Sequence, residues 1–229
     1  MPYGLICTCL GVFFGGLLGN ALRRYISDDL RDVLPRLFGL TAIGNGVISV
    51  IQAAHMPAVT LAVIVGGGLG TVLHLEKRVH SGLAAALQRV PRPAGFDMEQ
   101  YITVVAVFCA SGFGLYAVMV ESFSGARSQM FSKAIMDFFA AVIFGSSMGI
   151  SVSLIALPQA VVFFAFFFLA KLLMPIMGQA MLSNFIACGG VLTIAAGMRM
   201  AGIRKYPLID MLPALALVLL LTPLWAALF

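Results

Sequence analysis

Charged residues are scarce in this chain: they make up 10% of its 229 residues, whereas soluble domains carry about 25%. Hydrophobic residues account for 61%. A soluble protein could not hide this much apolar surface, because interiors grow slowly with chain size. The composition therefore excludes a soluble enzyme, a soluble nucleic-acid-binding protein and a disordered chain. It indicates a protein whose main solvent is lipid.

Cysteine is also rare, with four residues that each lie inside an apolar run. Cys7 and Cys9 are two apart, so on a helix they point to different faces. The three histidines do not cluster with any cysteine. We therefore expect four small buried thiols, with no disulfide, no metal site and no cofactor.

The strings that carry common catalytic chemistry are missing as well. No phosphate-binding loop is present, which argues against a nucleotide-driven pump, and no nucleophile stands beside a base. We therefore do not expect an enzyme. The formal net charge of +5 comes from short loops, where Lys and Arg orient a membrane protein and do not bind nucleic acid.

Long apolar runs predict an all-α fold, a polytopic bundle of transmembrane helices that forms one integral membrane domain over residues 1–229. A bilayer needs about 20 apolar residues per helix, and every backbone polar group must be satisfied within the protein. Seven spans remain possible, because the sixth is short and the eighth contains Pro213 and Pro223. The eight predicted spans are 4–22, 37–54, 58–75, 100–120, 132–156, 159–174, 182–202 and 208–229.

Basic residues occur in alternate loops, after the first, third and seventh spans. The positive-inside rule makes these loops cytoplasmic and places both termini outside. Two cytoplasmic segments, 27–36 and 74–90, have apolar residues at helical spacing. They predict amphipathic helices that either lie on the inner leaflet or extend a span past the membrane surface.

A glycine-bearing string recurs along the chain. Residues 12–19 match residues 63–70 and 142–149, and residues 188–192 resemble them more weakly. Small residues four apart let helix backbones approach closely, and these glycine faces would also allow a homodimer. The pattern fits either a parallel four-plus-four duplication, as in many transporters, or convergence, because apolar helices are built from few residue types.

Ionisable residues inside spans are costly and mark interior or water-facing positions. Lys133 and Asp137 are four apart on the fifth span, so they share a helix face and can pair. Ser147 and Ser151 lie ten and fourteen residues after Asp137 and extend a predicted polar stripe. The stripe is either a substrate or ion site, or an interhelical ion pair that holds the bundle together.

Other polar residues in the spans are weaker candidates for the same site. Asn20 lies in the first span, and Asn45 and Ser49 share a face of the second with Gln52. They either line a ligand or hydrogen-bond across helices, and the glycines that flank Asn45 could unwind the second span locally. Glu121, at the outer end of the fourth span, is either a site residue or an interfacial charge.

Two resemblances add to this interpretation. The strings Phe108-Cys109-Ala110-Ser111-Gly112 and Phe131-Ser132-Lys133, followed by Asp137-Phe138-Phe139, resemble the centre of the YqgA/YdfK-type bacterial inner-membrane proteins. That resemblance implies a multi-pass inner-membrane location and no established substrate. Residues 15–25 resemble the opening motif of small fluoride channels, which implies an ion pathway.

The sequence thus favours a secondary transporter of a small solute or ion. Its expected partners are the bilayer and that solute, with no nucleic acid, and the glycine faces would allow a homodimer. Asp137 would carry a coupling proton or bind a cation, and Lys133 would pair with it or attract an anion. The alternatives are a passive ion channel, for example for a halide, and a structural or signalling membrane subunit.

Overall fold

The computed structural model describes residues 2–87, 101, 104–105, 108–109, 112–173, 175 and 177–228. Every regular element in these residues is a helix, which confirms the all-α fold. Four helical stretches are long and apolar enough to cross a bilayer, and two shorter apolar helices accompany them. The long stretches are α1 (Tyr3–Ala21), α2 (Asp28–Val50), Ser128–Leu172 and α9 (Gln179–Met200), and the shorter helices are α3 (Met56–Val72) and α10 (Pro213–Leu228).

The chain divides into two compact units, each assembled from segments that are distant in the sequence. Unit 1 comprises Met1–Pro35, Arg78–Ala110 and Ala117–Ala170. Unit 2 comprises Arg36–Lys77, Ser111–Tyr116 and Lys171–Phe229. The first, fourth, fifth and sixth predicted spans therefore fall mainly in unit 1, and the others fall mainly in unit 2.

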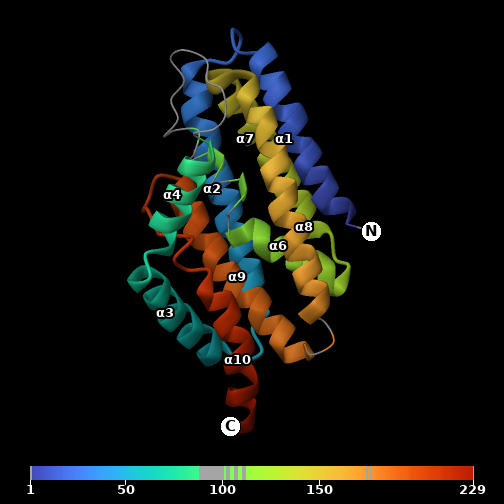
Figure 1. The fold of residues 1–229 in the computed structure, drawn as a ribbon, viewed down its shortest axis with the longest axis vertical. Helices are drawn as coiled ribbons and strands as arrows, with labels where there is room; N and C mark the ends of the chain where they lie inside the picture. Colours follow the sequence, from blue (N-terminus) through green and yellow to red (C-terminus); the bar gives the residue numbers. More distant parts are fainter. Residues whose placement is uncertain are drawn as a thin grey trace. The chain divides into compact units, whose positions relative to one another are not determined.

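Unit 1 is built on α1 and α7 (Ser128–Met148), which lie side by side (Figure 1). The glycines of α1 make this approach possible, because side chains there would collide with α7. Gly4 lies against Met130, Gly11 against Ala134, and Gly15 against Phe138. The residue numbers rise together along both helices, so α1 and α7 run parallel, as the predicted threading of the first and fifth spans requires.

The chain reverses after α7, which corrects the predicted fifth span of 132–156. Gly149 has a φ of 75°, a conformation that favours glycine, and it ends α7 at Met148. A 3-10 helix, η1 (Gly149–Ile155), leads into α8 (Ala156–Leu173). Gln159 contacts Asp137, although a straight helix would separate residues 22 positions apart by about 33 Å. The stretch from α7 to α8 is therefore an antiparallel hairpin.

Unit 2 pairs its helices through small residues as well. Gly46 of α2 packs on the carbonyl of Gly190 in α9, and Gly39 packs on that of Gly197. The residue numbers of the contacting glycines rise along α2 as they fall along α9, so these two helices are antiparallel. In α3, Gly66 lies against Ala214 at the start of α10. These contacts, with those of α1, confirm the packing role predicted for the recurring glycines, and the duplication itself stays a prediction.

Several predicted boundaries were wrong. Segment 27–36 is not a separate amphipathic helix but extends the second span, the other of the two alternatives, because α2 runs unbroken from Asp28 through Pro35 and through the glycines at 44 and 46. Segment 74–90 does begin a new helix, α4 (Leu75–Leu87), after a break at His74, whose φ is 51°. Residues 88–90, and residues 100, 102–103, 106–107 and 110–111 of the fourth span, lie outside the described residues.

The remaining ends shift by a few residues. The described part of the fourth span continues as α6 (Gly112–Ser124), four residues past its predicted end. The eighth span begins at Pro213, where proline suits the first turn of a helix, so residues 208–212 form turns. Pro223 lies within α10 and does not end it.

Candidate functional site

Lys133 and Asp137 form the centre of the candidate site, one turn apart on α7. The Lys133 ammonium donates to both carboxylate oxygens of Asp137, with Nζ–O distances of 2.6 and 2.8 Å. Only 4% of Lys133 and 6% of Asp137 are exposed. The predicted pair is therefore present, and it is enclosed within unit 1 instead of facing lipid.

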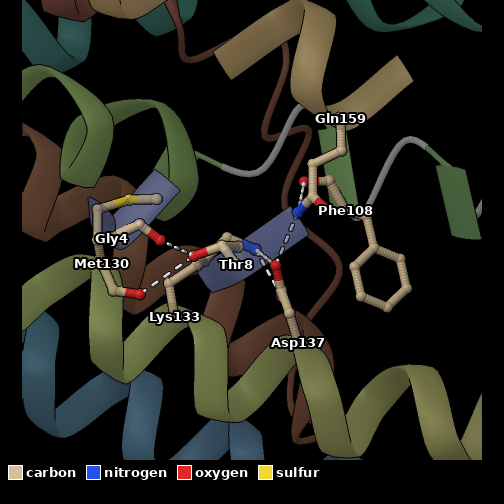
Figure 2. Close-up of polar contacts among 7 residues, drawn as sticks. All are labelled: Gly4, Thr8, Phe108, Met130, Lys133, Asp137 and Gln159. Carbon is tan, nitrogen blue, oxygen red and sulfur yellow. Dashed lines mark hydrogen bonds and ion pairs between the residues drawn. The ribbon is translucent and has the colours of Figure 1, made fainter. Parts of the chain in front are cut away.

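Gln159 of α8 completes the site from the other arm of the hairpin. Its Nε2 donates to Oδ2 of Asp137 at 2.8 Å and, at 3.4 Å, to the backbone carbonyl of Phe108 (Figure 2). The side chain is fully buried. The sequence analysis missed Gln159, although it is the one amide in the apolar run of α8 and lies directly after Pro158. We call Lys133, Asp137 and Gln159 the ionic triad.

The ionic triad lies about halfway along α1. Gly11 lies against Ala134 and Gly15 against Phe138, so Lys133 and Asp137 are level with the middle of the 19-residue helix. Thr8 of α1 donates to the carbonyl of Met130 one turn earlier on α7 (Figure 2). If α1 spans the bilayer, the charged groups are far from both water phases.

One acceptor and one N–H donor of the ionic triad have no partner among the described residues. The Oε1 atom of Gln159 accepts no hydrogen bond. The ammonium of Lys133 has three N–H donors, and Asp137 takes two of them. The ring of Phe163 lies 5.9 Å from that ammonium, which favours its positive charge. The site thus holds one spare donor and one spare acceptor in a buried place.

The structure does not bring the predicted serines to this pair. Ser147 is exposed, and its hydroxyl donates to the carbonyl of Phe144 within its own helix. Ser151 lies in η1 beyond the reversal, where its hydroxyl donates to Met148 and its carbonyl accepts from Tyr101. The polar stripe expected along one helix is therefore replaced by contacts across the hairpin.

Glu121 has a different place from the one predicted. It is buried, and its two carboxylate oxygens accept from the backbone N–H groups of Gly4 and Leu5 at 2.9 and 3.1 Å. These are unpaired donors of the first turn of α1, where a negative charge also suits the helix dipole. Glu121 therefore caps α1 from the end of α6. Asn20, at the other end of α1, lies half-buried beside Gly149.

Asn45 and Ser49 belong to unit 2. The amide of Asn45 donates to the carbonyl of Thr41 in the same helix, so it makes a local contact. Ser49 is buried, and its hydroxyl lies 3.1 Å from the hydroxyl of Tyr116 in α6. Of the two explanations for this face, interhelical hydrogen bonding is the one seen at Ser49.

The chemistry open to the ionic triad is proton and charge exchange. A lone carboxylate, an ammonium and an amide can hold or release a proton and can pair with a small ion. Among the residues that the structure describes, no three His, Cys, Asp or Glu side chains gather to hold a metal. A fully buried ion pair adds little net stability, because its desolvation cost offsets its Coulomb attraction.

Comparisons with known proteins agree with this membrane fold. A family model described as "Protein of unknown function (DUF554)" matches residues 3–223. The chain is 34% identical to the uncharacterized protein YqgA of Escherichia coli K12, over the full length of both. It is 20% identical to the uncharacterized membrane protein YdfK of Bacillus subtilis, over 93% of this chain and 92% of that protein. No solved structure gives a significant match. With its family model matched over nearly its whole length, this membrane protein belongs to the DUF554 family.

Proposed function

We propose that the protein is a secondary transporter of a small solute or ion, and that the ionic triad is its coupling site. Asp137 takes up and releases the coupling proton, and Lys133 supplies the matching charge. The observation that carries this proposal is the buried Lys133–Asp137 pair halfway along α1. Ionisable residues at such depth mark ion pathways and proton relays in membrane proteins.

The energetics of the pair support a working role. Moving each charge out of water costs several kcal/mol, and well-packed apolar side chains of similar volume often serve stability as well or better. The long polar side chains of the ionic triad nevertheless occupy this buried position in unit 1. The spare donor and acceptor of the ionic triad also suit a site that exchanges partners, because a purely structural network would be expected to satisfy every group.

Every group of the ionic triad belongs to unit 1, so one compact part of the chain supplies the whole of the proposed coupling site.

The predicted threading gives the proposal its setting. It has both termini outside, the resemblance implies a bacterial inner membrane, and a proton gradient across that membrane would drive the cycle. No enzymatic step is part of the proposal. The groups of the site do not include the activated nucleophile that covalent catalysis needs.

A structural or signalling subunit is the second candidate. The near-complete enclosure of the ionic triad favours it, because a sealed ion pair can fix the register of packed helices. A passive channel is the third alternative, and it would show flux that follows only the electrochemical gradient of the permeant ion.

Purified protein in liposomes tests the proposal. Uptake of a solute in response to an imposed pH gradient is expected, and Asp137→Asn should abolish this proton-coupled uptake while the protein still folds. Asp29→Asn, at an exposed position at the start of α2, is the matched control. Folding failure of the Asp137 variant, or absence of any coupled flux in the wild type, would favour the structural subunit.

A further inference from the structure

The ionic triad also points to the class of solute, an inference that rests on the proposed function. We infer that the protein carries a small monovalent inorganic anion together with one proton. Asp137 holds the proton, and the ammonium of Lys133 holds the anion. The transported pair is therefore electrically neutral.

Charge balance in the buried site is the first step. The resting site holds one ammonium and one carboxylate, so its net charge is zero. Protonation converts the carboxylate of Asp137 into a neutral carboxyl and leaves the ammonium of Lys133 without its counter-ion. An uncompensated buried charge is strongly unfavourable. A monovalent anion on Lys133 restores neutrality, since one positive and one negative charge are again present.

The same balance could be kept by a cation on Asp137 and loss of the proton from Lys133, but the surroundings oppose that exchange. The ring of Phe163 favours the charged form of the ammonium. Hard cations need several oxygen ligands, whereas the partners of the carboxylate among the described residues are N–H donors, those of Lys133 and Gln159. The ammonium, in contrast, has a spare N–H group that can donate a hydrogen bond to an anion.

Gln159 is a positioning residue in this scheme. Its Nε2 donates to the ionised carboxylate, so the amide faces that group with its N–H side. When Asp137 is protonated, rotation of the amide brings the unpartnered Oε1 to accept the carboxyl O–H. One side chain thus satisfies both protonation states of Asp137.

The other ionisable neighbours do not compete for this role. The groups close enough to interact electrostatically with the pair are the thiols of Cys9, on α1, and Cys109. Among the described residues, neither thiol is hydrogen-bonded to the pair, and Glu121 is engaged with the first turn of α1. Asp137 is therefore the carboxylate available for the coupling proton.

Proton entry into liposomes under imposed ion gradients tests the inference. The full-length protein is reconstituted with a pH-sensitive dye inside, and an inward gradient of chloride, bromide or nitrate is applied at zero membrane potential. At least one anion should acidify the interior without generating current. Sodium, potassium and lithium gradients should produce no proton movement in either direction.

Two variants separate the proton from the anion. Asp137→Asn resembles the protonated carboxyl permanently, so it should keep anion flux, lose proton entry to the level of protein-free liposomes, and become electrogenic. Lys133→Met should lose the anion-driven flux entirely. Asp29→Asn and Lys171→Met change exposed residues of the same type and should behave as the wild type.

The outcomes distinguish this inference from the proposed function. Proton counterflow driven by a cation, with all three anions inert, overturns the inference and leaves a proton-coupled transporter. Absence of proton flux under every gradient overturns the inference, and absence of any solute uptake under the imposed pH gradient described above overturns the proposed function as well. If a variant does not fold, the comparison of anion gradients with cation gradients in the wild type still tests the inference.

Discussion

Replacing the ion pair of α7 with apolar side chains should separate its stability from its function. The Nζ–O distances of 2.6 and 2.8 Å give a Coulomb attraction of about 6 kcal/mol at an effective dielectric constant of about 20. Desolvation of the two ions costs several kcal/mol each. These terms nearly cancel, so the pair as a whole contributes little to folding.

The single and double variants then differ sharply. Lys133→Met leaves the carboxylate of Asp137 buried without its partner and should lower the free energy of unfolding by about 3–5 kcal/mol. The double variant Lys133→Met/Asp137→Leu removes both charges. Its free energy of unfolding should return to within about 1 kcal/mol of the wild type or exceed it by about 1–4 kcal/mol, while coupled transport stays lost.

Equilibrium unfolding of the wild type, Lys133→Met, Asp137→Leu and the double variant in mixed micelles provides the measurement. The reasoning would be refuted if the double variant were as unstable as the sum of its two single changes. That result would mean that the pair holds the hairpin together, and the second candidate function, a structural subunit, would then be preferred.

Three further predictions concern packing and capping. Gly16→Val should destabilise the protein by about 1–3 kcal/mol, because the added side chain overpacks against η1. Gly68 has open space around it, so Gly68→Ala should be neutral or stabilise the protein by up to about 1 kcal/mol. Thermal unfolding of the two variants provides the comparison. Glu121→Ala should cost about 0.5–2 kcal/mol by removing the cap of α1, seen as faster hydrogen exchange in its first turn, and unchanged exchange there would contradict the cap. Tyr116→Phe should lower the free energy of unfolding by about 0.6 kcal/mol, and by not more than about 1.7 kcal/mol, because its hydrogen bond to Ser49 is lost. A larger decrease in chemical unfolding would contradict an ordinary interhelical hydrogen bond at this position.

The sequence predicted what depends on local spacing. Lys133 and Asp137 are four apart, which alone brings them together on a helix, and the apolar runs predicted most helices to within a few residues. The glycine strings predicted close helix packing because a missing side chain has the same effect in any helix pair.

Contacts that depend on the path of the chain were out of reach. Gln159 joins the site only because the chain reverses at Gly149, and the sequence analysis had run the fifth span on to residue 156. Glu121 binds backbone N–H groups 117 and 116 residues away, and backbone donors leave no mark in a sequence. Ser147 lies on the same helix as Asp137, but at about 100° per residue it is turned about 80° away from that side chain, and it is exposed.

Infrared difference spectroscopy of the reconstituted protein can observe directly whether Asp137 takes up a proton when an anion binds. When chloride is added at mildly acidic pH, the account predicts a new band from a protonated carboxyl group that is absent in Asp137→Asn and present in Asp29→Asn. A carboxylate of Asp137 that stays ionised under every anion and pH would contradict the account, because such a group exchanges no proton.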